Sequence, residues 1–157
     1  MHEKTFYEDI YLFLKKATQE NKDYHLLTFF SEVVNLLKSH FEKMDWVGFY
    51  LVDEEHSTLY LGPYRDGVDA CENIPKGKGV CGTAYQEEKT QLVNDVLQLT
   101  NYIACSSSTQ SEIVLPCFHN GKIIAVLDID SDQQAAFDSE DQEQLERILS
   151  LTKEIQR

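Results

Sequence analysis

The chain carries four cysteines, the residues best suited to covalent redox chemistry: Cys71, Cys81, Cys105 and Cys117. No two of them have C-x-x-C spacing and no histidines have H-x₃₋₅-H spacing, so a structural zinc site is not expected. Cys71, Cys81 and Cys105 lie in segments that the sequence predicts to be loops, where a rigid scaffold commonly presents reactive thiols. The alternative is that all four are small buried hydrophobes, as free cysteines often are.

Cys117 differs from the other three because it falls in a predicted strand, residues Glu112–Phe118. Side chains alternate between the two faces of a strand, so Cys117 shares a face with Ile113 and Leu115. Glu112 falls on the opposite face. We therefore expect Cys117 to be a packing residue.

Three carboxylates are predicted to lie on one face of a pair of strands. Asp128 and Asp130 are two residues apart in a strand that is otherwise apolar, so both point to the face of Val126. Glu112 opens the strand that an Asn-Gly turn pairs with this one. Three acids in a partly enclosed pocket repel each other and lose hydration, so the cluster favours a bound cation or one protonated member. The alternative is that the acids lie at strand ends and are simply solvated.

Two aromatic residues are predicted to flank a glycine in the first strand. Trp46 and Tyr50 are four residues apart and share a face, with Gly48 between them on that face. The missing side chain at Gly48 leaves a gap, and the two rings can form a slot for a slim apolar group. An ordinary contribution to the core explains the same residues equally well.

The string Gly77-x-Gly79-x-x-Gly82 matches the dinucleotide-binding fingerprint, but its context does not. It follows a loop containing Pro75 instead of a strand, and no acidic residue ends a second strand about 20 residues further on. We reject dinucleotide binding on these grounds. The glycines still suit a helix N-terminus whose amide groups can receive an anion, such as a substrate carboxylate.

Helical periodicity predicts helices at both ends of the chain. Apolar residues recur at helical intervals after a capping box at Thr5 and Glu8, and again over Leu26–Phe41 as a buried helix. Ser139 with Gln142 is expected to cap a C-terminal helix.

Between these helices, β-branched and aromatic residues predict a meander of strands. The expected strands are Trp46–Val52, Thr58–Leu61, Thr90–Val93, Glu112–Phe118 and Lys122–Ile129. Thr83–Glu88 is expected to be a short helix, Arg65–Gly82 irregular, and Val96–Thr109 a loop with one helical turn. The resulting fold class is α+β, with N- and C-terminal helices packed on a central, mainly antiparallel sheet.

Length and charge exclude several classes of protein. The 157 residues suit one domain spanning residues 1–157. The apolar runs are too short for a membrane span and the polar start MHEKTFYEDIY shows no secretory signal, so a cytoplasmic protein is expected. A net charge of −13 disfavours binding to nucleic acid or to anionic membranes, both of which need a basic surface.

Six short strings together resemble one enzyme family: WVGFYL (Trp46–Leu51), LGP (Leu61–Pro63), IPKGKGVCGTA (Ile74–Ala84), IAC ending at Cys105, SEIVLP (Ser111–Pro116) and VLDIDS (Val126–Ser131). They are similar to free methionine-(R)-sulfoxide reductase, which uses a stand-alone GAF domain, a PAS-related fold with a central antiparallel sheet. The resemblance implies a GAF-like fold and thiol-dependent reduction of free L-methionine (R)-S-oxide to L-methionine.

The same resemblance implies roles for individual thiols. Cys105 would attack the sulfoxide, Cys71 would resolve the resulting sulfenic acid as an intramolecular disulfide, and Cys81 would be a further thiol in the relay. It remains open whether Cys71 or Cys81 partners Cys105 first. Cys117 lies outside the three-cysteine pattern of the family, in agreement with a packing role.

The family's substrate-binding residues also transfer, while no metal or bound cofactor is implied. They are expected to be Trp46 and Tyr50 around the S-methyl group, and Glu112, Asp128 and Asp130 around the rest of the substrate. Thioredoxin, kept reduced by NADPH through thioredoxin reductase, would supply the electrons. A homodimer through the terminal helices is compatible with the family.

Two other classes of function stay open beside this enzyme. One is a GAF module that binds a small ligand or senses redox state without turnover, since most GAF domains are sensors. The other is a purely structural interaction domain, in which all the cysteines would be unreactive.

Overall fold

The computed structural model describes residues 2–65 and 70–156, and its elements follow the predicted order of helices and strands. In chain order they are α1 (His2–Glu20), α2 (Leu26–His40), β1 (Trp46–Asp53), β2 (Thr58–Arg65), β3 (Asn73–Pro75), α3 (Gly79–Glu87), β4 (Gln91–Val93), η1 (Val96–Gln98), β5 (Ser111–His119), β6 (Lys122–Ser131), α4 (Ser139–Leu149) and η2 (Ser150–Glu154). The strands form one six-stranded sheet in the order β3-β2-β1-β6-β5-β4. Every neighbouring pair is antiparallel, which confirms the predicted α+β class.

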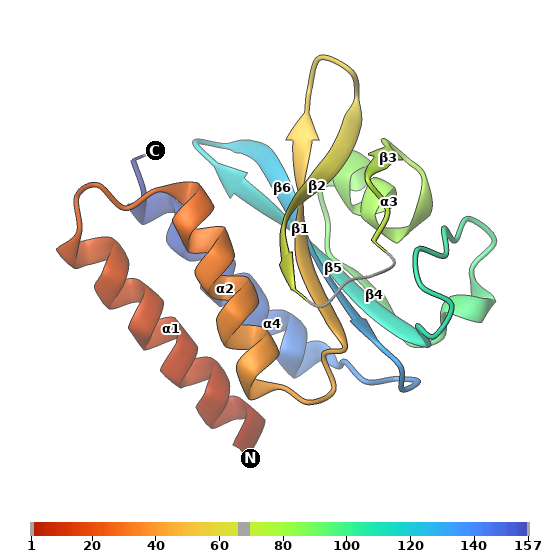
Figure 1. The fold of residues 1–157 in the computed structure, drawn as a ribbon, viewed down its shortest axis with the longest axis horizontal. Helices are drawn as coiled ribbons and strands as arrows, with labels where there is room; N and C mark the ends of the chain where they lie inside the picture. The colour runs from red at the N-terminus through yellow and green to blue at the C-terminus, as the bar shows by residue number, and fades with distance from the viewer. Residues whose placement is uncertain (1, 66–69, 157) are drawn as a thin grey trace.

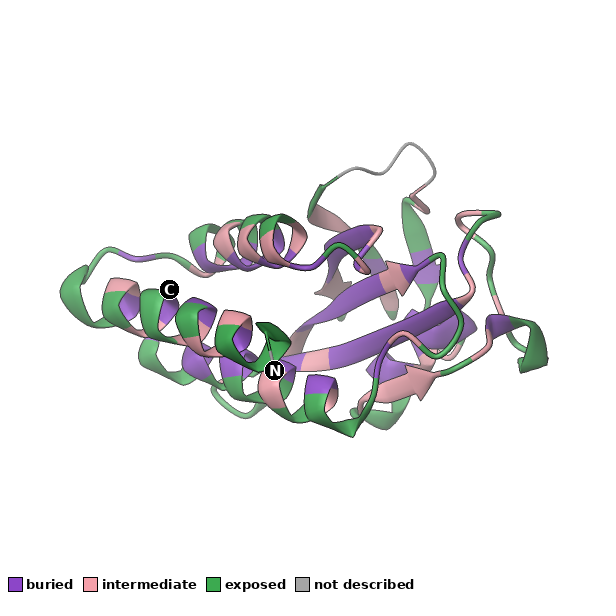
Figure 2. Cartoon of the chain, turned by 90° about the horizontal axis from the view of Figure 1, so that it is seen from below, coloured by how far each residue is buried: buried purple, intermediate pink, exposed green. Residues whose placement is uncertain are grey.

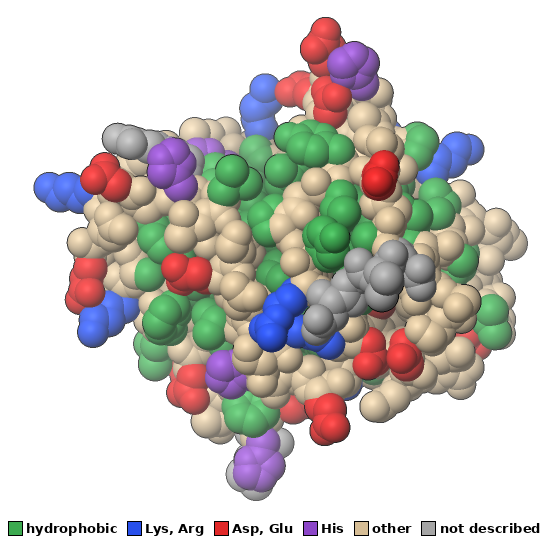
Figure 3. Space-filling view, in the orientation of Figure 1, with side chains coloured by type: hydrophobic (Ala, Val, Ile, Leu, Met, Phe, Trp, Pro, Cys, Tyr) green, Lys and Arg blue, Asp and Glu red, His purple; other side chains and the backbone are tan. Residues whose placement is uncertain are grey.

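The helices divide between the two faces of this sheet (Figure 1). α1, α2 and α4 lie side by side over one face, whereas α3 lies on the other. Figure 2 shows buried residues where the helical layer meets the sheet and exposed residues on its outer side. Within the described ranges, no helix has both the length and the apolar character needed to cross a membrane. Acidic side chains are spread over the face seen in Figure 3, in keeping with the net charge of −13.

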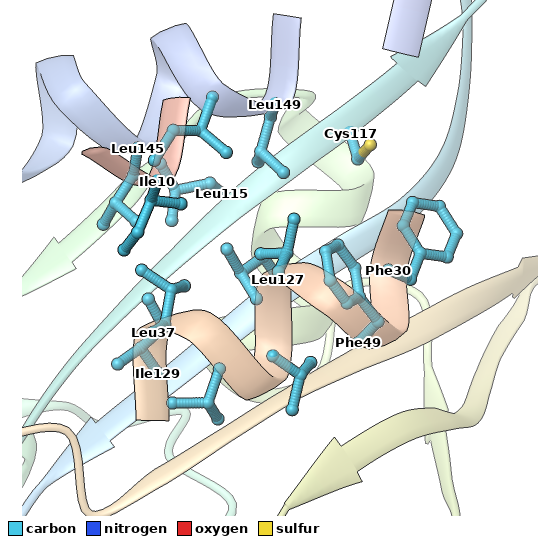
Figure 4. Close-up of a cluster of buried hydrophobic side chains, with 14 of the residues drawn as sticks. Ile10, Phe30, Leu37, Phe49, Leu115, Cys117, Leu127, Ile129, Leu145 and Leu149 are labelled. Carbon is cyan, nitrogen blue, oxygen red and sulfur yellow. The ribbon is translucent and has the colours of Figure 1, made fainter. Parts of the chain in front are cut away.

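The sheet face under α1, α2 and α4 carries the main hydrophobic core (Figure 4). Alternation along β5 places Ile113, Leu115 and Cys117 in this core, each at most 1% exposed. Phe30 of α2 stacks on Phe49 of β1 with ring centroids 4.3 Å apart. Burial raises the pKa of the Cys117 thiol to about 12, so it stays protonated. The predicted packing role of Cys117 is therefore confirmed.

Two helix starts differ from the predicted ones. α1 begins before Thr5 and Glu8, so this pair lies inside the helix and is not its N-terminal capping box. At α4 the N-cap is Asp138, whose carboxylate accepts a hydrogen bond from the Asp141 backbone N–H. The Asp141 carboxylate accepts one from the Asp138 N–H in return. These two reciprocal hydrogen bonds satisfy the backbone N–H groups of Asp138 and Asp141. Asp138 is therefore the N-cap, and Ser139 is the first residue of the helix.

The segment Arg65–Gly82, predicted to be irregular, contains regular structure as well; its residues 66–69 lie outside the described part of the chain. Asn73–Pro75 forms an edge strand, β3, which pairs with β2. Helix α3 begins at Gly79, four residues before the predicted start at Thr83. Glycine and proline concealed both features, because glycine disfavours helices and proline is tolerated in a sheet only at places such as edge strands.

Glycines allow the start of α3 to lie close against β3. Gly77 and Gly79 have φ values of +83° and +65°, which residues with a Cβ rarely adopt. A Cβ on Gly82 would lie 2.5 Å from the carbonyl oxygen of Pro75. The motif therefore begins a helix, as predicted, and its glycines let that helix approach the sheet edge.

Replacing Gly82 with alanine should destabilise the fold, because the new methyl group meets the backbone of β3. We expect the free energy of unfolding to fall by about 1–2 kcal/mol, as for other overpacked sites. Urea unfolding monitored by circular dichroism measures the change. The sign of the change in the free energy of unfolding is the test, because a glycine-to-alanine change in an uncrowded helix stabilises a protein by about 1 kcal/mol. A more stable Gly82→Ala protein would contradict the close contact.

Candidate active site

The three predicted carboxylates lie together on the sheet face opposite the main core. Glu112 of β5 is paired directly with Asp130 of β6, and Asp128 is paired with Val114 two residues along. Glu112 and Asp128 are each only 5% exposed. The alternative that the acids are solvated strand ends is therefore wrong for these two residues. We call Glu112, Asp128 and Asp130 the acid cluster.

Burial changes the protonation of the acid cluster. It raises the pKa of Glu112 well above the usual range of a carboxyl group, and the charges of Asp128 and Asp130 raise that pKa further. Burial, and then the charge of Asp128, likewise raise the pKa of Asp130. Because like charges in one cavity oppose full ionisation, the cluster retains a proton near neutral pH and can donate it.

Cys81 joins the acid cluster from α3. Its Sγ and one carboxylate oxygen from each of Glu112 and Asp128 all lie within 4.8 Å of one another. Burial, and then the charge of Asp128, raise the pKa of the Cys81 thiol. Cys81 is therefore a protonated thiol in this state.

The other two candidate reactive cysteines, Cys71 and Cys105, form a disulfide with Cα atoms 5.3 Å apart, an ordinary separation for such a bond. Cys105 lines a cavity together with Cys81 and the acid cluster. Cys71 packs against the apolar residues on this side of the sheet, among which Cys81 is buried. Segments far apart in the sequence thus bring Cys81 and Cys105 to one carboxyl-lined cavity, with Cys71 bonded to Cys105 beside it.

The cavity lies between the sheet, the start of α3 and the chain that leads into Cys105. Its remaining walls come from Ile74, Tyr102 and Ile103 and from residues 78–80. About 20 Å³ is free for the centre of a water molecule, which is room for one or two waters. In this disulfide-linked state the cavity is therefore closed to a molecule as large as an amino acid.

The N-terminus of α3 borders the cavity through Gly79 and Val80. Backbone N–H groups in the first turn of a helix have no partner within the helix and carry partial positive charge. Such a terminus binds anions, carboxylates included. The cavity therefore offers carboxyl groups that suit a cation and, beside them, a helix start that suits an anion.

Trp46 and Tyr50 lie on the predicted face, next to the acid cluster, but the gap at Gly48 is filled. The Trp46 indole lies over Gly48. Its ring centroid is 6.0 Å from that of Tyr50 and 5.9 Å from that of Tyr64. Trp46 is also the cross-strand neighbour of Asp130. The expectation of an open slot at Gly48 is wrong for this state, because the indole itself occupies the space.

Three residues around the cavity and the indole were missed by sequence reasoning. Tyr102 and Ile103 line the cavity from the loop after η1, whose lack of periodicity gives no signal for orientation. Burial, and then Glu112, raise the pKa of the Tyr102 hydroxyl, in keeping with its place beside the acid cluster. Tyr64 pairs with Gly48 across β1 and β2, a register that a bulge shifts and that spacing alone cannot give.

Comparisons with known proteins agree with this geometry. The GAF domain family matches residues 26–153. GAF domain-containing protein A of Dictyostelium discoideum is 55% identical over 106 residues, which make up 68% of this chain and 66% of that protein, just under two thirds of its length. Free methionine-R-sulfoxide reductase of Escherichia coli is 36% identical over 97% of this chain and 93% of that protein.

A solved structure agrees with this chain in both fold and sequence. The X-ray structure of free methionine-R-sulfoxide reductase from Neisseria meningitidis, in complex with its substrate, has a TM-score of 0.85 and 37% identity. The match covers 94% of this chain and 87% of that one. The chain therefore belongs to the GAF-domain family, and within it to the free methionine-R-sulfoxide reductases.

Proposed function

We infer that this chain is an oxidoreductase that reduces free methionine-R-sulfoxide to methionine, with Cys105 as the attacking thiol and Cys71 as the resolving thiol. The observation that carries the proposal is a disulfide between these two cysteines at a cavity lined by three carboxyl groups. The E. coli relative is named for this reaction, and the N. meningitidis structure is a complex with its substrate.

Both charged ends of a free amino acid have a complementary group in this cavity. We assign the ammonium group to the acid cluster and the carboxylate to the amides of Gly79 and Val80 at the start of α3. A methionine sulfoxide inside a peptide carries neither charge, so it would leave buried acids without a counter-ion, which costs several kcal/mol. The cavity thus selects the free amino acid by penalising the alternative.

The reaction transfers the sulfoxide oxygen to Cys105. The Cys105 thiolate attacks the sulfoxide sulfur, and Glu112, whose raised pKa keeps it protonated, donates a proton to the oxygen. Methionine leaves and Cys105 is left as a sulfenic acid. The Cys71 thiol condenses with that acid, which forms the disulfide and releases water.

We assign Trp46 and Tyr50 to the S-methyl end of the substrate. They flank the acid cluster, since Trp46 is the cross-strand neighbour of Asp130. Burial, and then the charge of Asp128, raise the pKa of the Tyr50 hydroxyl, in keeping with a place beside the cluster. Held by its charged ends, the substrate directs its methyl group to the rings and its oxygen to Glu112. Only one configuration at sulfur then presents the sulfur atom to Cys105.

Cys81 is our candidate for a third thiol in the relay. It is free, lines the same cavity as Cys105 and packs near Cys71. Its raised pKa holds it as a thiol, so exchange with the disulfide would be slow while the acid cluster is ionised. This makes Cys71, and not Cys81, the first partner of Cys105.

The disulfide needs an external reductant, and we propose thioredoxin, itself reduced by NADPH through thioredoxin reductase. Dithiol exchange returns two electrons and needs no bound cofactor. Leu99 and Ile103 are 37% and 36% exposed. Ile103 lines the cavity of Cys105, and Leu99 lines an adjoining hollow that shares Gly79 and Val80 with it. This apolar surface beside the disulfide suits a docking protein.

The activity itself is tested by NADPH oxidation coupled through thioredoxin reductase and thioredoxin. We expect turnover of free methionine-R-sulfoxide and none of the S epimer. Blocking both charged ends, as in N-acetyl-methionine-R-sulfoxide amide, should lower kcat/KM by about 10²-fold or more, because about 3 kcal/mol of charge pairing is lost. Equal rates for free and blocked substrates would refute the proposed recognition, and binding without turnover would favour a GAF sensor.

Cysteine variants separate the proposed thiol roles. Cys105→Ser should abolish turnover, because no sulfenic acid can form. Cys71→Ser should release one equivalent of methionine per protein and then stop, since the sulfenic acid has lost its partner. Cys117→Ser is the control, because this thiol is buried on the other face of the sheet and should not alter turnover. Quenched-flow measurement of methionine release gives the number of equivalents formed per protein. Sustained thioredoxin-linked turnover of Cys71→Ser would transfer the resolving role to Cys81.

A charge at Leu99 should impair docking of thioredoxin but not the chemistry. For Leu99→Asp we expect the KM for thioredoxin to rise by about 10-fold, equivalent to about 1.4 kcal/mol, while turnover with the small reductant dithiothreitol stays unchanged. Phe118→Asp is a matched control, since Phe118 is 38% exposed and lies toward the opposite end of β5 from Glu112. Equal effects of both variants on the KM would argue against docking at Leu99.

A further inference from the structure

We propose that Cys81, Glu112 and Asp128 form a binding site for Zn²⁺ that is separate from the redox disulfide. Their three ligand atoms, one sulfur and two carboxylate oxygens, all lie within 4.8 Å of one another. The residues come from three elements, α3, β5 and β6. Metal-binding spacings in the sequence give no sign of such a site, because no two of its ligands are close neighbours in the chain.

The spread of the three ligand atoms suits Zn²⁺. With Zn–S near 2.3 Å and Zn–O near 2.0–2.2 Å, the ligands of a tetrahedral Zn²⁺ lie about 3.5 Å apart. The observed separations of the three atoms, at most 4.8 Å, exceed this value by no more than about 1.3 Å. The free space of about 20 Å³ in the cavity holds one or two waters, and one of them can supply the fourth ligand.

An unsatisfied oxygen of Asp128 gives an independent reason for a cation at this place. Asp128 is 5% exposed, and within the described part of the chain its Oδ1 has no hydrogen-bond partner. A buried acceptor without a donor costs about 1–3 kcal/mol, and more when it is charged. Coordination to a metal removes this cost. The cavity that Asp128 lines is too small for an organic ligand in this state but has room for one ion.

The thiol makes the site selective for a thiophilic cation. Mg²⁺ and Ca²⁺ prefer six or more oxygen ligands, whereas thiolate favours Zn²⁺. On binding, the Cys81 sulfur bonds to the metal and its proton leaves to solvent, together with any proton held by the two carboxyl groups. No electrons are transferred, so the metal needs no oxidant or reductant.

Cys81 can bind a metal while Cys71 and Cys105 are bonded to each other, because it is free in the disulfide-linked protein. A second consequence rests on the proposed function: Glu112 and Asp128 would then serve either Zn²⁺ or the substrate ammonium group. Zn²⁺ and free methionine sulfoxide should therefore exclude each other. The site itself does not depend on turnover.

Metal titration of the disulfide-linked protein tests the site, and this form needs no thiol reductant that would itself bind metal. We expect one equivalent of Cd²⁺ to produce the ultraviolet absorption band of a thiolate–cadmium bond. We also expect one equivalent of Zn²⁺ to be withdrawn from a chromophoric chelator. Cys81→Ser should lose the cadmium band and weaken Zn²⁺ binding by at least about 10-fold. Cys117→Ser removes the other free thiol and should retain both signals.

Asp128→Asn gives a second line of evidence that survives if Cys81→Ser does not fold. It should keep the cadmium band, because the sulfur remains, but weaken Zn²⁺ binding by at least about 10-fold. No band in the original protein, a band retained in Cys81→Ser, or unchanged Zn²⁺ affinity in Asp128→Asn would each overturn the proposal. Because no substrate is present, these results are independent of whether the protein reduces methionine sulfoxide.

Discussion

The burial of three carboxyl groups on one face of the sheet is the constraint on which the rest of the site depends. Among the ion pairs of the described residues, none joins a basic side chain to the acid cluster. Lost hydration and, after it, mutual repulsion therefore act on Glu112 and Asp130 without compensation from a fixed cation, and their pKa values rise. The cluster is stable in a retained-proton state or with a cation supplied from outside, the role that we propose for the substrate ammonium group.

The strands tolerate this destabilising cluster because their other face belongs to the main core. Along β5 and β6 the side chains alternate, so Glu112 and Asp128 are flanked in sequence by fully buried residues such as Ile113 and Leu127. These apolar neighbours pack under α1, α2 and α4 and hold both strands in register (Figure 4). Stability and chemistry thus occupy opposite faces of the same two strands, and a one-residue slip would exchange them.

Features of the site that depend on neighbouring residues in the chain could be predicted from the sequence, whereas features that depend on distant segments or on rotamers could not. Period-two alternation is local, so the faces of Cys117 and of the acid cluster could be predicted and are confirmed. The pairing of Cys71 with Cys105 depends on two loops that meet in space. The residues alone predict no pairing, and the family resemblance leaves open whether Cys71 or Cys81 partners Cys105 first. The filling of the Gly48 gap by an indole depends on a rotamer, which strand periodicity does not specify.

The closed cavity places a condition on the order of events in the cycle. With the disulfide formed, the cavity has room for one or two waters, so neither the sulfoxide nor methionine fits beside the acid cluster. In the cycle that we propose, methionine must therefore leave before Cys71 bonds to Cys105. In the proposed cycle the acid cluster then holds no ammonium counter-ion, and burial keeps the pKa values of Glu112 and Asp130 raised, which favours their protonated state.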